Sequence, residues 1–383
     1  MKDRIYLDYA ATSPVLPEVL EEMLPFFTVC YGNPSGVYAT AREARQAVEK
    51  ARRQIADAIG AEPSEIYFTS GGSESDNMAI QGTARALRDQ GRHIITSAIE
   101  HHAVLNCCSQ LEMEGYEITR LPADRKGMID PREAREAIRP DTVLITVMAS
   151  NNEIGTNEPI GEIGAAAREA GVAFHTDAVQ AVGMIPLDVR ELPVDMLSIS
   201  AHKFYGPKGA GALYIRRGTR IDNLIFGGAQ ERGLRAGTEN TAGIVGMGKA
   251  IEIAMRDMES NRKRLRGLRD MMIRKVMENV PGVSVNGSME YRLDNNCHFS
   301  FTGIDGEALL LRLDLAGIAA SGGSACTSGS REPSHVLQAI GLDEERMNGS
   351  IRFTLGRDTT VQEIEETVRV MAGIVADLRQ MSR

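Results

Sequence analysis

The stretch EIYFTSGGSESDNMAIQGTARAL, at residues 65–87, contains a strand pattern, a tight turn and a helix pattern in direct succession. Residues 65–69 are rich in aromatic and β-branched side chains, and residues 74–87 carry apolar side chains at helical spacing. The glycines of Gly71-Gly72 allow a close backbone approach to a ligand, and a helix N-terminus attracts phosphate. An ordinary turn capped by Ser73 explains the same residues, so both interpretations stay open here.

The same alternation of strand and helix patterns continues for about 150 residues, because apolar runs and amphipathic stretches follow one another. This order predicts an α/β fold with a mostly parallel sheet covered by helices. The predicted strands lie at 93–96, 142–148, 172–174, 196–199 and 211–215, and the predicted helices at 103–113 and 160–170.

The pattern changes after about residue 238, where strands and helices no longer alternate regularly. We therefore predict a smaller α+β domain beside the large one. The large domain is expected at residues 15–255, and the small domain at residues 1–14 and 256–383. The expected elements of the small domain are a helix through 258–274, strands at 283–285, 297–301 and 350–354, and a helix at 361–378.

Composition narrows the class of protein. The chain has 383 residues, 43% of them hydrophobic, and a net charge of −9, which argues against a general nucleic-acid binder. We find no apolar run long enough to span a membrane and no secretory signal, so we expect a cytoplasmic protein. The five cysteines include no CxxC pair, which favours reduced thiols over disulfides and predicts no metal site.

Polar residues follow several predicted strands, where a parallel sheet places its ligands. Lys203 follows the strand at 196–199 and enters a turn rich in glycine and proline. A lysine there can form a Schiff base when it is deprotonated, although a solvated surface lysine is an equal alternative. Asp177 and His101 also follow strands; taken singly, a helix cap and a satisfied histidine are the simpler interpretations. Their clustering at strand ends is the stronger argument.

Cys326 lies among glycine, serine, alanine and threonine in the segment 321–330, which we predict to be a loop. An accessible thiol in such a loop is a candidate nucleophile, whereas most thiols in proteins are buried and inert. Cys107, Cys108 and Cys297 lie in helix or strand patterns and are expected to pack in the core.

Taken together, these segments resemble the NifS/IscS-type cysteine desulfurases, which are class V aminotransferase-like, fold-type I pyridoxal-phosphate enzymes. The likeness covers nearly the whole chain. It rests on residues 6–12 (YLDYAAT), 32–35 (GNPS), 69–77 (TSGGSESDN), 100–101 (EH), 201–209 (AHKFYGPKG), 230–233 (QERG), 324–329 (SACTSG) and 351–353 (IRF).

The resemblance implies pyridoxal 5'-phosphate as the cofactor, with Lys203 bound to it covalently. Asp177 would pair with the pyridine nitrogen, Gln180 would donate to the ring oxygen, and His101 would stack on the ring and carry protons. The residues implied for the phosphate are Gly72, Ser73, Ser200 and His202.

The resemblance also implies the substrate and the partners. Thr238 would reach the phosphate of a neighbouring subunit in a homodimer. Asn152 and Arg352 would bind the carboxylate of L-cysteine, and arginine suits that bidentate task. Cys326 would take the sulfur as a persulfide, leaving L-alanine, and pass it to an acceptor protein, either an iron–sulfur scaffold or a sulfur carrier. No membrane or direct nucleic-acid partner is expected.

Three alternatives share parts of this pattern. Another class V aminotransferase or lyase would use Lys203 and Asp177 but would need no Cys326. A selenocysteine lyase would share most of the site, so comparison of the two substrates would separate it. A non-catalytic scaffold for sulfur-carrier or iron–sulfur assembly proteins would need neither Lys203 nor Cys326.

Overall fold

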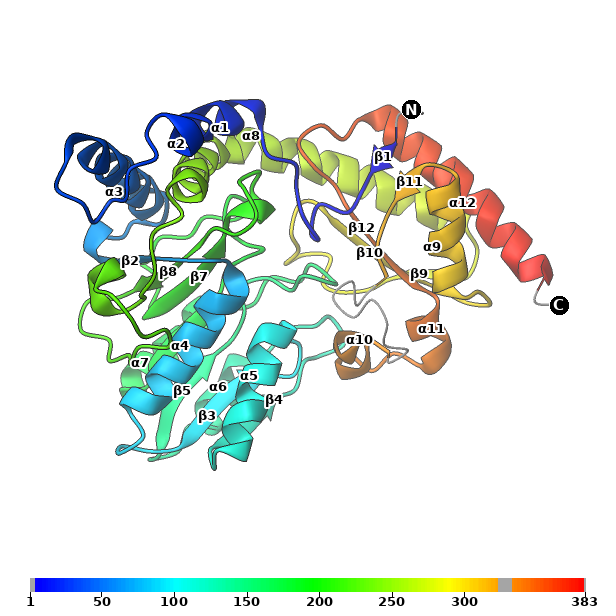
Figure 1. Ribbon diagram of the computed structural model, residues 1–383. Coiled ribbons are helices and arrows are strands. Elements are labelled where there is room, and N and C mark those ends of the chain that lie inside the picture. The colour runs from blue at the N-terminus through cyan, green and yellow to red at the C-terminus, as the bar shows by residue number, and fades with distance from the viewer. Residues whose placement is uncertain (1–3, 323–332, 382–383) are drawn as a thin grey trace.

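The structure is a computed structural model that describes residues 4–322 and 333–381 (Figure 1). A seven-stranded sheet forms the centre of its larger part, and five neighbouring strands of that sheet run parallel. The predicted α/β fold with a mostly parallel sheet is therefore confirmed. In spatial order the strands are β2 (Ile66–Thr69), β8 (Gly211–Ile215), β7 (Met196–Ser200), β6 (Ala173–Asp177), β5 (Thr142–Thr146), β3 (His93–Ser97) and β4 (Glu117–Leu121).

Helices cover both faces of the sheet. Neighbouring residues of a strand point to opposite faces, so each face presents its own set of side chains to the helices. Ile94 packs into one apolar cluster with the helices α4 (Gly72–Ala86) and α5 (His102–Met113). Ile95 packs into another with α3 (Ala39–Ile59), α6 (Pro131–Glu136) and α7 (Ile160–Ala170). The result is a three-layer arrangement in which the faces of the sheet are filled with side chains. Polar, reactive side chains are therefore found at the ends of the strands.

The edge strand β4 was not predicted from the sequence. Its residues are mostly half-buried or exposed, and it carries Glu117 and Arg120. An edge strand of this kind lacks the apolar run that identified the central strands. The central strands β3, β5, β7 and β8 are buried along their whole length, which is why the sequence showed them clearly.

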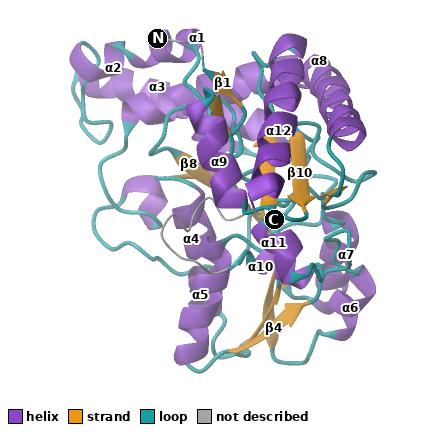
Figure 2. Ribbon diagram, turned by 90° about the vertical axis from the view of Figure 1, so that its right-hand side faces the viewer, coloured by secondary structure: helices purple, strands orange, loops and turns teal. Residues whose placement is uncertain are grey.

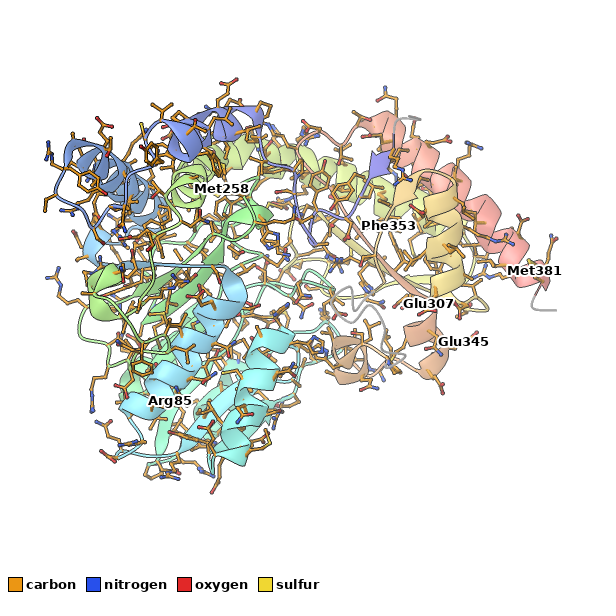
Figure 3. The ribbon with its side chains drawn as sticks, in the orientation of Figure 1. Arg85, Met258, Glu307, Glu345, Phe353 and Met381 are labelled. Carbon is orange, nitrogen blue, oxygen red and sulfur yellow. The ribbon has the colours of Figure 1, made fainter. Side chains whose placement is uncertain are left out.

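The helix α8 (Thr241–Asn279) joins the two parts of the molecule without a break. Its residue Ile251 belongs to the same apolar cluster as α3 and Ile95, whereas Met272 belongs to a second, smaller cluster. Phe353, labelled in Figure 3, lies inside that smaller cluster. The sequence boundary proposed at residue 255 falls within this continuous helix.

The smaller part contains a three-stranded antiparallel sheet with helices against it. Figure 2 shows α9 and α12 side by side on its outer surface. Its elements are β9 (Val283–Val285), β10 (Asn296–Phe301), β12 (Ser350–Thr354), α9 (Gly306–Leu315), α10 (His335–Ala339), α11 (Glu344–Asn348) and α12 (Val361–Met381).

The N-terminal segment belongs to both parts. Strand β1 (Ile5–Tyr6) pairs in parallel with β11 (Ile318–Ala319) of the smaller part. The chain then crosses to the large sheet, where α1 (Pro17–Met23) and α2 (Pro25–Thr28) pack near α8. No helix in the described ranges is both long and apolar enough to cross a membrane.

A buried ion pair fixes the long segment between β8 and α8 to the sheet. The guanidinium of Arg52, on α3, makes two 2.8 Å bonds to the carboxylate of Glu231. Glu231 also accepts the backbone N–H of Phe68, on β2, at 2.9 Å. Glu231 is therefore tied directly to the strand that leads into the glycine-rich turn.

We predict that Glu231→Ala lowers the free energy of unfolding by about 3 kcal/mol, because it leaves the buried Arg52 guanidinium without its partner. Urea unfolding at neutral pH would measure this loss. Glu169→Ala, which breaks an exposed pair with Arg135, is the matched control and should change the unfolding midpoint little. Equal effects of the two substitutions would contradict this account of Glu231.

Candidate active site

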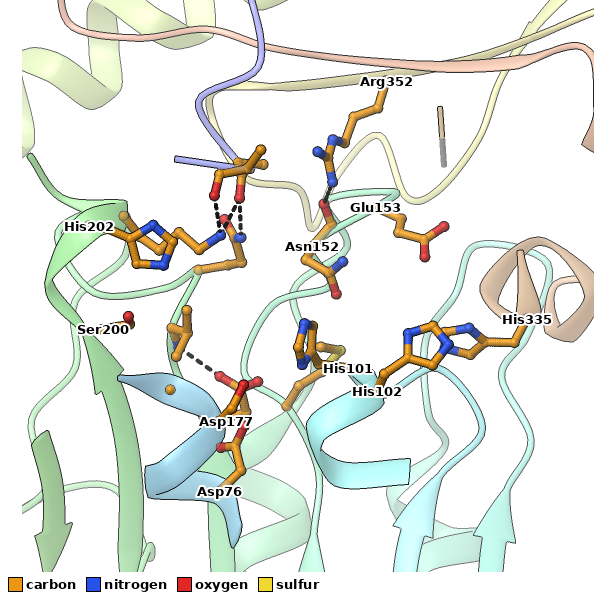
Figure 4. Close-up of a pocket in the computed structure, with 18 residues that line it drawn as sticks. Asp76, His101, His102, Asn152, Glu153, Asp177, Ser200, His202, His335 and Arg352 are labelled. Atoms are coloured by element: carbon orange, nitrogen blue, oxygen red, sulfur yellow. Dashed lines mark hydrogen bonds between the residues drawn. The ribbon is translucent and has the colours of Figure 1, made fainter. Parts of the chain in front are cut away.

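A cavity of about 390 Å³ lies at the carboxyl ends of the central strands, facing β12 of the smaller part (Figure 4). Most of the residues predicted for the site line this single cavity. They are Gly72, Ser73, His101, Asn152, Asp177, Gln180, Ser200, His202, Lys203 and Arg352.

Among the predicted site residues that the structure describes, Thr238 does not line this cavity. Thr238 is exposed and lies beside a different hollow, together with Gly209 and Arg235. Cys326 lies outside the described residues, as does most of the loop predicted at 321–330.

Lys203 is held by the N-terminal segment. It ends a short 3₁₀ turn at Ala201–Lys203, directly after β7. Its Nζ donates to the carbonyl oxygens of Ala10 at 2.5 Å and Ala11 at 2.9 Å. Gln180 donates to the same Ala10 oxygen at 3.0 Å. The backbone that follows β1 thus orients the amine inside the cavity.

His202 is anchored to the same segment. Its Nδ1 lies 3.1 Å from the hydroxyl of Thr12, and its carbonyl oxygen accepts the Ser13 hydroxyl at 2.9 Å. Burial lowers the pKa of His202 to about 4, and the charges of Lys203 and Lys208 add to that effect. The imidazole is therefore neutral at pH 7.

Asp177 and His101 face each other across the floor of the cavity (Figure 4). Asp177 ends β6, and its Oδ1 accepts the backbone N–H of Val179 at 2.9 Å. Burial raises the pKa of Asp177, while His101 and Lys203 act in the opposite direction. His101 caps α5 by accepting the N–H of Ala103 at 3.1 Å, and burial lowers its pKa.

The glycine-rich turn is packed closely at the N-terminus of α4. A Cβ on Gly72 would lie 2.7 Å from Cγ2 of Val179, and a Cβ on Gly211 would lie 2.6 Å from Cα of Gly71. Larger residues at these positions would displace the turn. The turn is fixed further by Glu74, which accepts the N–H of Ser70 at 2.9 Å and pairs with Arg235 at 2.7 Å.

Arg352 brings a buried cation to the opposite wall. One of its nitrogens donates to the carbonyl oxygen of Asn152 and another to Asp8, both at 2.8 Å. Its Nε is buried and has no hydrogen-bond partner among the described residues. Arg352 lines the cavity, and its two terminal nitrogens each carry a second N–H, so the guanidinium can donate to a further anion there.

Several residues at the cavity had no predicted role. Glu153 is buried, accepts the Ser334 hydroxyl at 2.5 Å, and has a pKa raised to about 7 by burial. The ring of His335 lies 4.7 Å from that of His102 and contacts the backbone of Glu100 at 2.9 Å. The position of Glu153 in a polar segment after a strand could have identified it from the sequence as a site residue. No comparable sequence pattern marks His335.

The cysteines of the helix and strand patterns pack as predicted. Cys107, Cys108 and Cys297 are buried, and burial raises the pKa of each thiol, to about 12 for Cys107 and Cys297. Thiols with so high a pKa are poor nucleophiles at neutral pH. Cys30 is partly exposed.

The cavity combines a lysine and a carboxyl group at the ends of neighbouring parallel strands. The family model Aminotransferase class-V matches residues 5–367.

The most informative relatives are cysteine desulfurases. "Cysteine desulfurase IscS" of Dictyoglomus turgidum is 56% identical over 100% of this chain and 97% of the relative. "Cysteine desulfurase IscS" of Methanosarcina thermophila is 53% identical over 99% and 93%. Among solved structures, "NIFS-LIKE PROTEIN" has a TM-score of 0.93 at 38% identity, covering 98% of this chain and 100% of that one. "SspA in complex with cysteine" has a TM-score of 0.81 at 41% identity, covering 92% and 98%. The chain belongs to the cysteine desulfurase family.

We predict that the imidazole of His202 titrates with a midpoint near its lowered pKa of about 4 when no ligand is bound, because burial and two lysines disfavour the cation. NMR of protein with isotopically labelled histidine would follow the titration, and His202→Gln would identify the resonance. A midpoint near the ordinary value of about 6.5 would contradict the environment described here.

Proposed function

We propose that this chain is a pyridoxal-phosphate-dependent cysteine desulfurase that converts L-cysteine to L-alanine and transfers the sulfur to an acceptor. The observation that carries this proposal is the composition of one cavity. It holds the amine of Lys203, the strand-end carboxyl of Asp177 and the guanidinium of Arg352.

The residues present fit pyridoxal 5'-phosphate at three points. The close-packed glycines at the N-terminus of α4, with Ser73 beside them, suit a phosphate group. Asp177 would pair with the pyridine nitrogen, and Lys203 would bind the aldehyde carbon. Ser200 and His202 line the same end of the cavity and complete the proposed phosphate contacts.

When bound, pyridoxal phosphate supplies an electron-withdrawing ring conjugated to the amine of the substrate. Asp177, as a carboxylate, would hold a proton on the ring nitrogen. His101 would stack against the ring, and Gln180 would donate to its phenolate oxygen. The Nζ of Lys203 would act as the base that removes the α-proton of the substrate.

The substrate carboxylate would bind at Arg352 and Asn152. Arg352 is already oriented by Asp8 and by the Asn152 carbonyl, so little reorganisation of the guanidinium is needed. A carboxylate that accepts from a buried guanidinium forms a strong, charge-assisted hydrogen bond.

The sulfur step is assigned to Cys326. Its thiolate would attack the substrate sulfur, forming an S–S bond while the substrate C–S bond breaks and its electrons remain on carbon. Protonation of that carbon gives L-alanine, and Cys326 keeps the sulfur as a persulfide. The net reaction of L-cysteine with one thiol to give L-alanine and one persulfide is balanced and requires no external oxidant.

A homodimer would complete the site. Thr238 is exposed, as the proposal requires for a residue that reaches the neighbouring phosphate. The surface around α1 to α3 also exposes apolar side chains, as does the segment before residue 238, which supports a subunit interface there. These side chains are Leu20, Leu24, Phe27, Val29, Tyr31, Val37, Tyr38 and Phe226. The sulfur acceptor is proposed to be an iron–sulfur scaffold or a sulfur carrier, and the location to be the cytoplasm.

An absorption spectrum of the purified protein, followed by addition of L-cysteine and a thiol reductant, tests the function. We expect visible cofactor absorbance together with alanine and sulfide as products. Cys326→Ala should keep the absorbance and lose product formation, whereas Cys30→Ala, the matched control, should keep both. A protein that binds the cofactor yet is indifferent to L-cysteine and to loss of Cys326 would refute the proposed reaction.

Substitution of Asp8 tests the substrate site separately. Asp8→Asn removes a charge-assisted bond to Arg352, so we expect the KM for L-cysteine to rise about tenfold with a smaller change in kcat. Steady-state kinetics would measure both constants. Asp130→Asn, at the exposed start of α6, serves as the control. An unchanged KM would show that Asp8 does not position Arg352.

A further inference from the structure

Asp76 is a buried acid at the floor of the active-site cavity, and the mechanism above does not use it. It lies on α4 with 1% of its surface exposed, and it lines the same cavity as Asp177. Figure 4 shows the two carboxyl groups next to each other, with Asp76 on the side away from His202. Two carboxyl groups in one buried site disfavour double ionisation.

Among the described residues, the groups that face Asp76 offer it no cation. His175, on β6, places Nε2 3.7 Å from Oδ1 of Asp76. The two nitrogens of that imidazole lie 2.8 Å from Thr146 and 2.9 Å from Ser198. Burial lowers the pKa of His175 to about 3, so the ring is neutral at pH 7. It can contact Asp76 but cannot balance a negative charge.

The remaining neighbours make ionisation less favourable. Glu100, just beyond the turn that follows β3, raises the pKa of Asp76 further, and Cys107 on α5 is a thiol whose own pKa is raised by burial, so neither supplies a cation. A hydrogen bond with Ser198 favours the ionised form, but burial and Asp177 outweigh it and raise the pKa of Asp76 well above its ordinary value. Oδ1 of Asp76 has no hydrogen-bond partner among the described residues.

Asp177 stands in a different environment. It accepts the N–H of Val179 and faces both His101 and Lys203, each of which favours its ionised form. A single negative charge shared by the two acids is therefore more stable on Asp177 than on Asp76. The asymmetry arises from which groups lie on each side of the pair.

We propose that Asp76 is a positioning residue that remains protonated and so keeps the negative charge of the acid pair on Asp177. This inference rests on the proposed function, because it concerns the residue assigned to the ring nitrogen. A second carboxylate at position 76 would favour a proton on Asp177 and would weaken its pairing with the ring. In its neutral form, Asp76 lies beside Asp177 without adding a second negative charge to the pair.

The sign of the pH effect distinguishes this role from an ordinary buried carboxylate. An acid whose pKa is raised by folding must keep its proton in the folded protein, so stability falls as pH rises above its unfolded pKa. Asparagine has nearly the same shape and never ionises. The unfolding temperature of Asp76→Asn should therefore increase relative to wild type as the pH rises from about 5 to 8.

The experiment measures thermal unfolding of the full-length protein, stripped of cofactor, across this pH range. Asp294→Asn is the matched control, since Asp294 is equally buried but pairs with Arg262 and Arg266. The Asp294→Asn substitution should lower the unfolding temperature at every pH from about 5 to 8. If Asp76→Asn behaves as Asp294→Asn does, Asp76 is ionised and the proposal is wrong.

A second measurement uses the protein loaded with pyridoxal 5'-phosphate. Asp76→Asn should retain the visible absorbance of wild type and its pH dependence, whereas Asp177→Asn should alter both. Loss of that absorbance in Asp76→Asn would overturn the proposal. If wild type itself takes up no cofactor, the proposed function fails, and the unfolding series still decides whether Asp76 carries a charge.

Discussion

The burial of both faces of the central sheet is the constraint on which the site depends. Ile94 and Ile95 show the principle, since adjacent residues of one strand fill apolar clusters on opposite sides. A polar ligand cannot be accommodated in either layer without displacing core side chains. Polar residues therefore gather where the strands end, and Asp177 of β6 and Lys203 after β7 lie there because those strands are parallel neighbours.

The smaller part of the molecule completes the site by supplying its opposite wall. Strand β1 pairs with β11, and the backbone that follows it reaches Lys203 through Ala10 and Ala11. Strand β12 brings Arg352, whose partners Asp8 and Asn152 come from segments on either side of the cavity. Because these bonds cross between the two parts, the relative position of the parts would also set the geometry of the proposed substrate site.

The sequence predicted the parallel sheet and the residues of the cavity, because buried strands are apolar runs and the polar residues that follow them are conspicuous. It missed β4, whose half-exposed residues lack that pattern. It gave no role to Asp76 or His335, because their significance depends on neighbours that are distant along the chain. The proposed roles of Thr238 and Cys326 likewise depend on a second subunit and on residues outside the described ranges.

The central claim is that Lys203 binds the cofactor covalently. Reduction of the cofactor-loaded protein with borohydride, followed by peptide mass mapping, tests it most directly. The account predicts a pyridoxyl group on Lys203, which the N-terminal backbone holds inside the cavity, and none on the exposed Lys208 of the same turn. A label on Lys208, on other lysines, or on no lysine at all would contradict the assignment of this site.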